Sequence, residues 1–256
     1  MTRFLVLCHP RSGSTLLMEA LGQHPAVHQG SEIFNPVLEG VADYVDWRKR
    51  VMVELFGVQD SYLTQWGYLD DERFDLSRLA ARFFDDFNGV KVMYDQLPLG
   101  SKAWQYLQSL PDLRVIVLRR NPIASAVSFQ TAMQSEVWHL EANDPLPEEQ
   151  RLVLPTDFLE WFYRHFCAPK ASILPLFDPG RILTVDYEDL VGRWGDTLQQ
   201  VQQHIGLPEE PMSMRFRQRR QKTLPERVIN WRELRQQHAE HPVLGPLFKD
   251  VEEKGL

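Results

Sequence analysis

Four short apolar runs, separated by helical patterns, constrain the fold of this 256-residue chain most strongly. The runs are Phe4–Cys8, Val90–Met93, Val115–Leu118 and Ile182–Val185. Each is continuous rather than alternating, as expected for a strand covered on both faces. The helical patterns cover Ser14–Leu21, Leu76–Phe87 with Asp75 as N-cap, Ser101–Leu110, Pro122–Gln134 and Trp194–Ile205. Strands that alternate with helices predict an α/β fold with a mainly parallel β-sheet flanked by helices.

Composition limits the partners and the compartment of the chain. A net charge of −7 argues against nucleic-acid binding and against adhesion to anionic membranes, because both need a broad basic surface. The two cysteines, Cys8 and Cys167, form no CxxC pair, so a disulfide framework or a cysteine zinc site is not expected. No apolar run reaches the length of a membrane span and no signal peptide precedes the first strand, which predicts a cytoplasmic protein. Nothing requires a second domain within residues 1–256.

The first loop, residues 9–15 (HPRSGST), links the end of a buried strand to the start of a helix. The first amides of such a helix lack intrahelical partners and favour an anion. Gly13 permits a close approach, Ser12, Ser14 and Thr15 offer hydroxyls, and Arg11 offers a permanent charge. The loop is P-loop-like but lacks the lysine of G-x-x-x-x-G-K-[ST], which disfavours ATP or GTP. The alternative is a helix start capped by Ser12 or Ser14, with Arg11 solvated.

The second loop follows the third apolar run, in VIVLRRNPIASAVSFQ (residues 115–130). A strand again ends in basic residues, and Asn-Pro then begins a helix with Pro122 in its first turn. In a parallel sheet both strand ends open on one edge, so Arg120 and Ser128 are candidates to hold a second phosphate of the same ligand. The alternative is a solvated Arg120 and a Ser128 that bonds back to a helix carbonyl.

Together these segments resemble a known family. RSGST and LRRNP-x5-S are similar to the two nucleotide signatures of sulfotransferases that use 3′-phosphoadenosine-5′-phosphosulfate (PAPS). Residues 182–208, with the sequence YEDL and a terminal GLP, resemble a third segment of that family. HQGSEIFNP (residues 28–36) and GVKVMYDQLP (residues 89–98) are similar to segments of bacterial carbohydrate and lipid sulfotransferases, including those that act on trehalose or nodulation factors.

The resemblance implies roles for individual residues. The first loop would hold the 5′-phosphosulfate through Arg11, Ser12, Gly13, Ser14 and Thr15, with Arg11 also stabilising the departing phosphate. Arg120 and Ser128 would hold the 3′-phosphate, and Tyr187 would lie on the adenine side. A C-terminal segment near residues 211–232 would close over the nucleotide, with Arg219 and Lys222 as candidate contacts. PAPS is thus the expected co-substrate, and no metal is expected because the transferring group carries less charge than a phosphoryl group.

Glu32 is the candidate base that removes the acceptor proton, because the carbohydrate branch of the family has a glutamate in a similar place. Burial would raise the pKa of Glu32 and Arg11 would lower it, and the sequence leaves the net direction open. His28 is the second candidate for the base. Lys91, Tyr94 and Gln96 would line the cleft as donors to the leaving group or the acceptor. The alternatives are a surface ion pair or turn cap for Glu32 and an ordinary strand-edge charge for Lys91.

The expected activity is transfer of a sulfuryl group to a hydroxyl of a sugar, glycolipid or other small molecule. Irregular inserts near residues 37–75 and 137–157 are predicted to form the acceptor-side walls, which leaves the acceptor unidentified. Two other functions stay open: a P-loop kinase that uses ATP, and a nucleotide-binding domain without turnover. A homodimer also stays open, because nothing marks a dimer face. The pair His238 and His241 is expected on a solvated helix face rather than at a metal.

Overall fold

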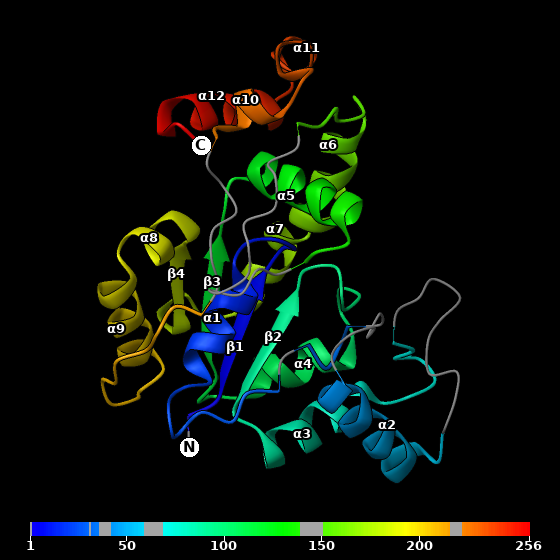
Figure 1. The fold of residues 1–256 in the computed structure, drawn as a ribbon. Helices are drawn as coiled ribbons and strands as arrows, with labels where there is room; N and C mark the ends of the chain where they lie inside the picture. Colours follow the sequence, from blue (N-terminus) through cyan, green and yellow to red (C-terminus); the bar gives the residue numbers. More distant parts are fainter. Residues whose placement is uncertain (1, 31, 36–41, 59–68, 139–150, 216–221) are drawn as a thin grey trace.

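Four parallel strands form the centre of the molecule in the computed structural model, which describes residues 2–30, 32–35, 42–58, 69–138, 151–215 and 222–256. The strands are β1 (Phe4–Cys8), β2 (Gly89–Met93), β3 (Arg114–Arg119) and β4 (Ile182–Asp186). They lie in the order β2-β1-β3-β4, and every neighbouring pair is parallel (Figure 1). The prediction of a parallel α/β sheet is therefore confirmed, with three of the strands one or two residues longer than their apolar runs.

Alternate residues of the strands pack into different cores on the two faces of the sheet. Leu5 and Leu7 of β1 belong to one core, which contains α2 (Ala42–Phe56), α3 (Leu76–Asp86), α4 (Lys102–Ser109) and part of α7 (Lys170–Ile173). Phe4 and Val6 belong to the other core, which contains α1 (Ser14–Leu21), α8 (Tyr187–Gly192) and α9 (Trp194–His204). Both faces are thus covered, which explains why the strand sequences are apolar throughout.

A third apolar core lies beyond the carboxyl ends of the strands. It joins α5 (Pro122–Ser135), α6 (Phe158–Phe162) and the π-helical turn Tyr163–Cys167 to the C-terminal helices. Those helices are α10 (Leu224–Arg227), α11 (Trp231–Gln237) and α12 (Leu244–Lys254), which lie at the top of Figure 1. Short 3-10 turns cover Leu174–Leu176 and Pro179–Arg181. Since α5 begins at the second loop, this core fixes the helix that follows Arg120.

The insert near residues 37–75 differs from its prediction, because it contains the helix α2 and is not irregular throughout. Trp47, Val51 and Met52 of α2 are buried in the core of the sheet face. The guanidinium of Arg48, which is 1% exposed, donates from Nη1 to the carbonyl of Ile33 at 3.0 Å and also to the carbonyl of Asn35. The insert therefore supports the segment that carries Glu32.

The C-terminal histidine pair also differs from its prediction. His238 is 4% exposed, stacks on Phe248 and has its Nε2 3.2 Å from the carbonyl of Thr156, so it does not lie on a solvated face. Nδ1 of His241 accepts from the amides of Val243 and Leu244 at the start of α12. Both rings therefore help to hold the third core together. Within the residues that the structure describes, no helix is long and apolar enough to cross a membrane.

Candidate active site

The candidate site is assembled from the carboxyl ends of all four strands. The first loop follows β1, the turn Tyr94–Gln96 follows β2, Arg120 follows β3 and Tyr187 follows β4. Because the strands are parallel, their carboxyl ends open on one edge of the sheet, which is where ligands of such sheets bind. Residues that are far apart in the sequence therefore meet here.

The first loop presents an uncapped helix start. Gly13 is the N-cap of α1 with φ of 92°, and in the described structure no side chain caps the helix amides. The alternative of a helix capped by Ser12 or Ser14 is therefore not observed. A Cβ at residue 13 would lie 2.5 Å from Cδ2 of Tyr187, so both the backbone angle and the packed tyrosine ring require glycine. The ring of Tyr187 thus lies against the loop.

The hydroxyl of Ser12 provides a second feature of an anion site. Ser12 is fully buried, and its Oγ has no hydrogen-bond partner among the described residues. A buried hydroxyl without a partner is costly in a folded protein unless a ligand or water satisfies it. Together with the free amides at the start of α1, it fits an anion bound at the loop.

The second loop contacts the first through side chains. The guanidinium of Arg120 lies 4.1 Å from the centre of the Tyr187 ring, and its Nη1 donates to the carbonyl of Arg11 at 2.6 Å. In turn, Nε of Arg11 donates to Oγ of Ser128 at 3.2 Å, and its Nη1 donates to the carbonyl of Trp138 at 2.6 Å. Arg120 is therefore not a solvated charge. The side chain of Arg11 is directed to the second loop, so the residues predicted for the two phosphates form one cluster.

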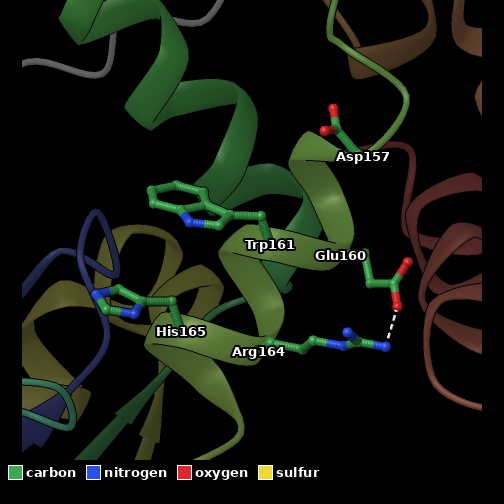
Figure 2. Close-up of a pocket in the computed structure, with 5 residues that line it drawn as sticks. All are labelled: Asp157, Glu160, Trp161, Arg164 and His165. Carbon is green, nitrogen blue, oxygen red and sulfur yellow. Dashed lines mark ion pairs between the residues drawn. The ribbon is translucent and has the colours of Figure 1, made fainter.

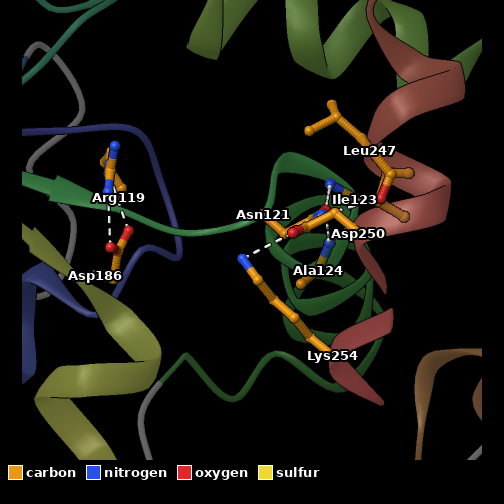
Figure 3. A network of polar contacts seen from close by, with 8 residues as sticks. All are labelled: Arg119, Asn121, Ile123, Ala124, Asp186, Leu247, Asp250 and Lys254. Atoms are coloured by element: carbon orange, nitrogen blue, oxygen red, sulfur yellow. Dashed lines mark hydrogen bonds and ion pairs between the residues drawn. The ribbon is translucent and has the colours of Figure 1, made fainter. Parts of the chain in front are cut away.

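Asn121 anchors the second loop to the C-terminal helix. Its Oδ1 accepts from the amides of Ile123 and Ala124 and so caps α5, while its Nδ2 donates to the carbonyl of Leu247 at 3.0 Å and to Asp250 Oδ2 at 2.8 Å. Figure 3 shows these contacts together with the Asp250–Lys254 ion pair of α12. The Asn-Pro sequence predicts the helix start, but α12 comes from more than a hundred residues away and no local pattern indicates its contact.

His9, at the end of β1, contacts the first turns of α5. Its Nε2 lies 2.9 Å from Oγ of Ser125, and the residue is 5% exposed. Burial, with the nearby charges of Arg120 and Lys170, lowers the pKa of His9 to about 3. The ring is therefore neutral at physiological pH and acts as a hydrogen-bonding spacer between β1 and α5.

Glu32 lies in a network that reaches the first loop. Lys91 Nζ is 2.5 Å from Oε1 of Glu32 and donates to Oγ1 of Thr15 at 3.3 Å. Oε2 of Glu32 accepts from Gln96 Nε2 at 2.8 Å and from Asn35 Nδ2 at 2.6 Å. Lys91 is 3% exposed, so it is not an ordinary strand-edge charge. Glu32, Lys91 and Gln96 were each predicted as site residues from the sequence, but no local pattern indicates the contact of Asn35 or the ion pair between Lys91 and Glu32.

The network decides the protonation of Glu32. Burial alone would raise the pKa of its carboxyl, but the charge of Lys91, with hydrogen bonds from Lys91, Asn35 and Gln96, holds the pKa below its ordinary value. The direction that the sequence left open is thus set by Lys91 rather than by Arg11. Glu32 is an ionised carboxylate at neutral pH, and the side chain of Lys91 links it to Thr15 of the first loop.

Of the other predicted residues that the structure describes, Tyr94 stays at the site, in the turn after β2, and the rest do not. His28 is exposed and pairs through its backbone with Asn88, just before β2 begins, so the length of that strand separates it from the turn that contacts Glu32. Tyr94 is 2% exposed, and its hydroxyl has no partner in the described structure. Lys222 is exposed at the start of the last described segment, and Arg219 lies outside the described residues. In the described ranges, no three His, Cys, Asp or Glu residues are grouped as metal ligands.

The chain is similar to known proteins over most of its length. The sequence model described as "Sulfotransferase family" matches residues 4–211. Nodulation protein H of Rhizobium meliloti (strain 1021) is 27% identical over 254 residues, covering 93% of this chain and 92% of the relative. Nodulation protein H of Rhizobium tropici is 25% identical, covering 93% and 90%. The crystal structure of a sulfotransferase from Alicyclobacillus acidocaldarius superposes with a TM-score of 0.53 at 14% identity, covering 98% of this chain and 95% of that chain, which shows a shared fold.

Proposed function

The chain belongs to the sulfotransferase family and is an enzyme, and from that premise we propose that it transfers a sulfuryl group from PAPS to a hydroxyl group of an acceptor. One observation carries the proposal. The uncapped start of α1, with the unpartnered hydroxyl of Ser12, is linked by Lys91 to the ionised carboxylate of Glu32. A loop suited to an anion and a carboxylate suited to act as a base are thus linked, which supports a group transfer from a bound anion.

The nucleotide would be held at two ends. The amides of α1, with Ser12, Ser14 and Thr15, would bind the 5′-phosphosulfate, and Arg120 and Ser128 would bind the 3′-phosphate. Arg11 was expected at the 5′-phosphosulfate and the departing phosphate, but it donates to Ser128 and would therefore reach the 3′-phosphate. The ring of Tyr187, which packs on Gly13 and under Arg120, would lie beside the adenine. Lys222 and Arg219 remain candidates for closing over the nucleotide. Recognition of a phosphate at the 3′ position, which ATP lacks, is what would distinguish this site from that of an ATP-dependent kinase.

In the proposed reaction the acceptor oxygen attacks sulfur in line. Glu32 takes the proton of the acceptor hydroxyl, a bond forms between that oxygen and sulfur, and the bond from sulfur to the 5′-phosphate oxygen breaks with its electron pair left on the phosphate. Lys91 lies between Glu32 and Thr15, so its charge would serve both the carboxylate and the departing phosphate. Gln96 and Asn35 keep Glu32 in place. No step requires a metal.

For the acceptor we propose only a chemical class. It carries a hydroxyl, and the likeness of residues 28–36 and 89–98 to carbohydrate and lipid sulfotransferases supports a sugar or glycolipid. A screen of hydroxyl compounds with radiolabelled PAPS would identify it. The same assay tests the base, because Glu32→Gln keeps the shape of the side chain and removes its ability to take a proton.

The expected result is a loss of about 10²- to 10⁴-fold in transfer by Glu32→Gln, with the affinity for adenosine 3′,5′-bisphosphate (PAP) nearly unchanged. Glu72→Gln, which changes an exposed carboxylate, is the matched control and should retain full transfer. A nucleotide-binding domain without turnover would show no transfer by the wild type and no effect of Glu32→Gln. If Glu32→Gln lost PAP binding as severely as transfer, its role would be structural rather than catalytic.

A further inference from the structure

A cavity of about 390 Å³ lies beside the turn that contacts Glu32. Its walls come from the turn and loop after β2, including Asp95, Leu97 and Leu99, and from the segment around α7, including His165 and Ile173. A second hollow of about 410 Å³ shares Arg164 and His165 with it and extends to Asp157 and Trp161 (Figure 2). The two hollows therefore adjoin, and none of the residues assigned to the nucleotide lines either one.

Asp95 is the unusual residue of this cavity. Its Oδ1 is buried, and it has no hydrogen-bond partner in the described part of the chain. Burial, with the charge of Glu32, raises the pKa of Asp95 to about 6, against a hydrogen bond from the residue's own backbone that lowers it. The buried Oδ1 without a donor is costly unless a ligand donates a hydrogen bond to it. Gln96, the next residue in the sequence, donates to Glu32, so Asp95 adjoins a residue that contacts the proposed base.

The neighbouring charges do not satisfy Asp95. Arg164, on the opposite wall, forms an ion pair with Glu160. The ring of His165 stacks on that of Trp161 (Figure 2). The ring centres are 5.7 Å apart and the planes differ by 9°. Across the described residues, no cation forms an ion pair with Asp95. The partner of this carboxylate is therefore to be sought in a ligand.

We propose that this cavity holds the body of the acceptor and that Asp95 selects acceptors carrying a second hydrogen-bond donor next to the hydroxyl that is sulfated. The inference rests on the proposed function, since it assumes that the reacting hydroxyl lies at Glu32. Leu97, Leu99 and Ile173 provide apolar walls for a ring, while Asp95 provides a carboxylate in the lining that can accept a hydrogen bond. The donor is a hydroxyl or an ammonium group, because each satisfies a carboxylate oxygen.

The test uses three probes that share one apolar ring: cyclohexanol, trans-cyclohexane-1,2-diol and trans-2-aminocyclohexanol. Transfer from radiolabelled PAPS is measured for each probe, and binding of each probe to the enzyme–PAP complex is measured by ligand-observed NMR. The variants are Asp95→Leu, which removes the acceptor, and Asp95→Asn, which keeps one carbonyl oxygen and the shape. Ser172→Ala, on another wall of the cavity, is the matched control.

The wild type should prefer the diol or the amino alcohol over cyclohexanol by about 10- to 100-fold, the value of a hydrogen bond to a charged group. Asp95→Leu should reduce both to the level of cyclohexanol, and Ser172→Ala should keep the preference. Asp95→Asn should keep part of the preference for the diol and lose that for the amino alcohol, which identifies the donor. Preference in binding without transfer of any probe would support the inference and count against the proposed reaction.

Two results would overturn the inference. One is a wild type that ranks the three probes equally in both measurements. The other is an Asp95→Leu variant that folds, binds PAP and loses all three probes to the same extent, because a merely structural residue would behave in that way. PAP binding is measured for every variant, so that damage to the nucleotide site is separated from loss of acceptor selection.

Discussion

Replacing Lys91 by methionine tests the network around Glu32 most severely. The variant leaves a carboxylate in place and removes the cation 2.5 Å from it, while methionine preserves the apolar length of the side chain. Breaking a buried ion pair by removing one partner costs about 3–5 kcal/mol. The side chain of Glu32 is 21% exposed and keeps the amide donors of Gln96 and Asn35, so about 2–3 kcal/mol is expected here.

The pH dependence of this loss gives an independent check. In the wild type, Glu32 has a lowered pKa, so its stabilising contribution is present above its ordinary pKa and is lost as the pH falls through the folded value. In Lys91→Met the burial remains without the cation, and the pKa of Glu32 rises. Protonation then relieves the buried charge, so the loss of stability in Lys91→Met should be smaller at pH 5 than at pH 7.5.

Urea unfolding of the wild type, Lys91→Met, Glu32→Gln and the double variant measures the coupling between the two side chains. We expect the double variant to be less destabilised than the sum of the single variants by about 2 kcal/mol. Arg193→Met, which removes an exposed helix ion pair with Asp189, is the control and should cost about 0.5 kcal/mol or less. Additive single variants, or a cost of Lys91→Met no larger than that control, would refute this account of the network.

Three further predictions concern the loops. Gly13→Ala should weaken PAP binding by at least about tenfold in calorimetry, because φ is 92° and the new Cβ would lie 2.5 Å from the Tyr187 ring. The control Gly192→Ala, whose Cβ meets no described atom within 4 Å, should bind PAP like the wild type. Equal affinities of the two variants would contradict the close packing at Gly13. His9 has a pKa of about 3 in the fold and an ordinary value of 6.5, so between pH 7 and pH 5 it takes up a proton only in the unfolded chain. The wild type should therefore lose about 2 kcal/mol of unfolding free energy over this range through His9, and His9→Gln should lose less in urea unfolding. An identical pH dependence of the two proteins would refute this role of His9. Arg120→Ala should weaken PAP far more than adenosine 5′-phosphate, and equal losses would show that Arg120 does not contact the 3′-phosphate.

The fold could be predicted because its signals are local. Continuous apolar runs marked all four strands, and Asp75 caps α3 as expected, with its carboxylate accepting from the amide of Ser77. The helix α2 escaped prediction for a physical reason. Its apolar residues are gathered on one side much less strongly than those of α3, and Arg48, a residue type that is seldom buried, is fully buried against backbone carbonyls. Such a helix is stabilised by tertiary contacts that no periodicity reveals.

The candidate site could be predicted only in its local parts. The first loop and the strand end at Arg120 each predict an anion site from a few neighbouring residues. The pairing of Lys91 with Glu32, and of Asn121 with Asp250, depends on which elements become neighbours after folding. From the sequence, Arg11 was therefore expected to lower the pKa of Glu32, whereas the cation that contacts Glu32 in the structure is Lys91 of β2. Asp95 was not predicted as a site residue for the same reason, because the other wall of its cavity comes from a segment about seventy residues away.

The central claim is that the two loops together recognise a nucleotide with phosphates at both its 3′ and 5′ positions. Isothermal titration of the wild type with PAP, and with ATP as the comparison, tests it without any knowledge of the acceptor. The account predicts that PAP binds more tightly than ATP and needs no added Mg²⁺. Tighter binding of ATP than of PAP would contradict it.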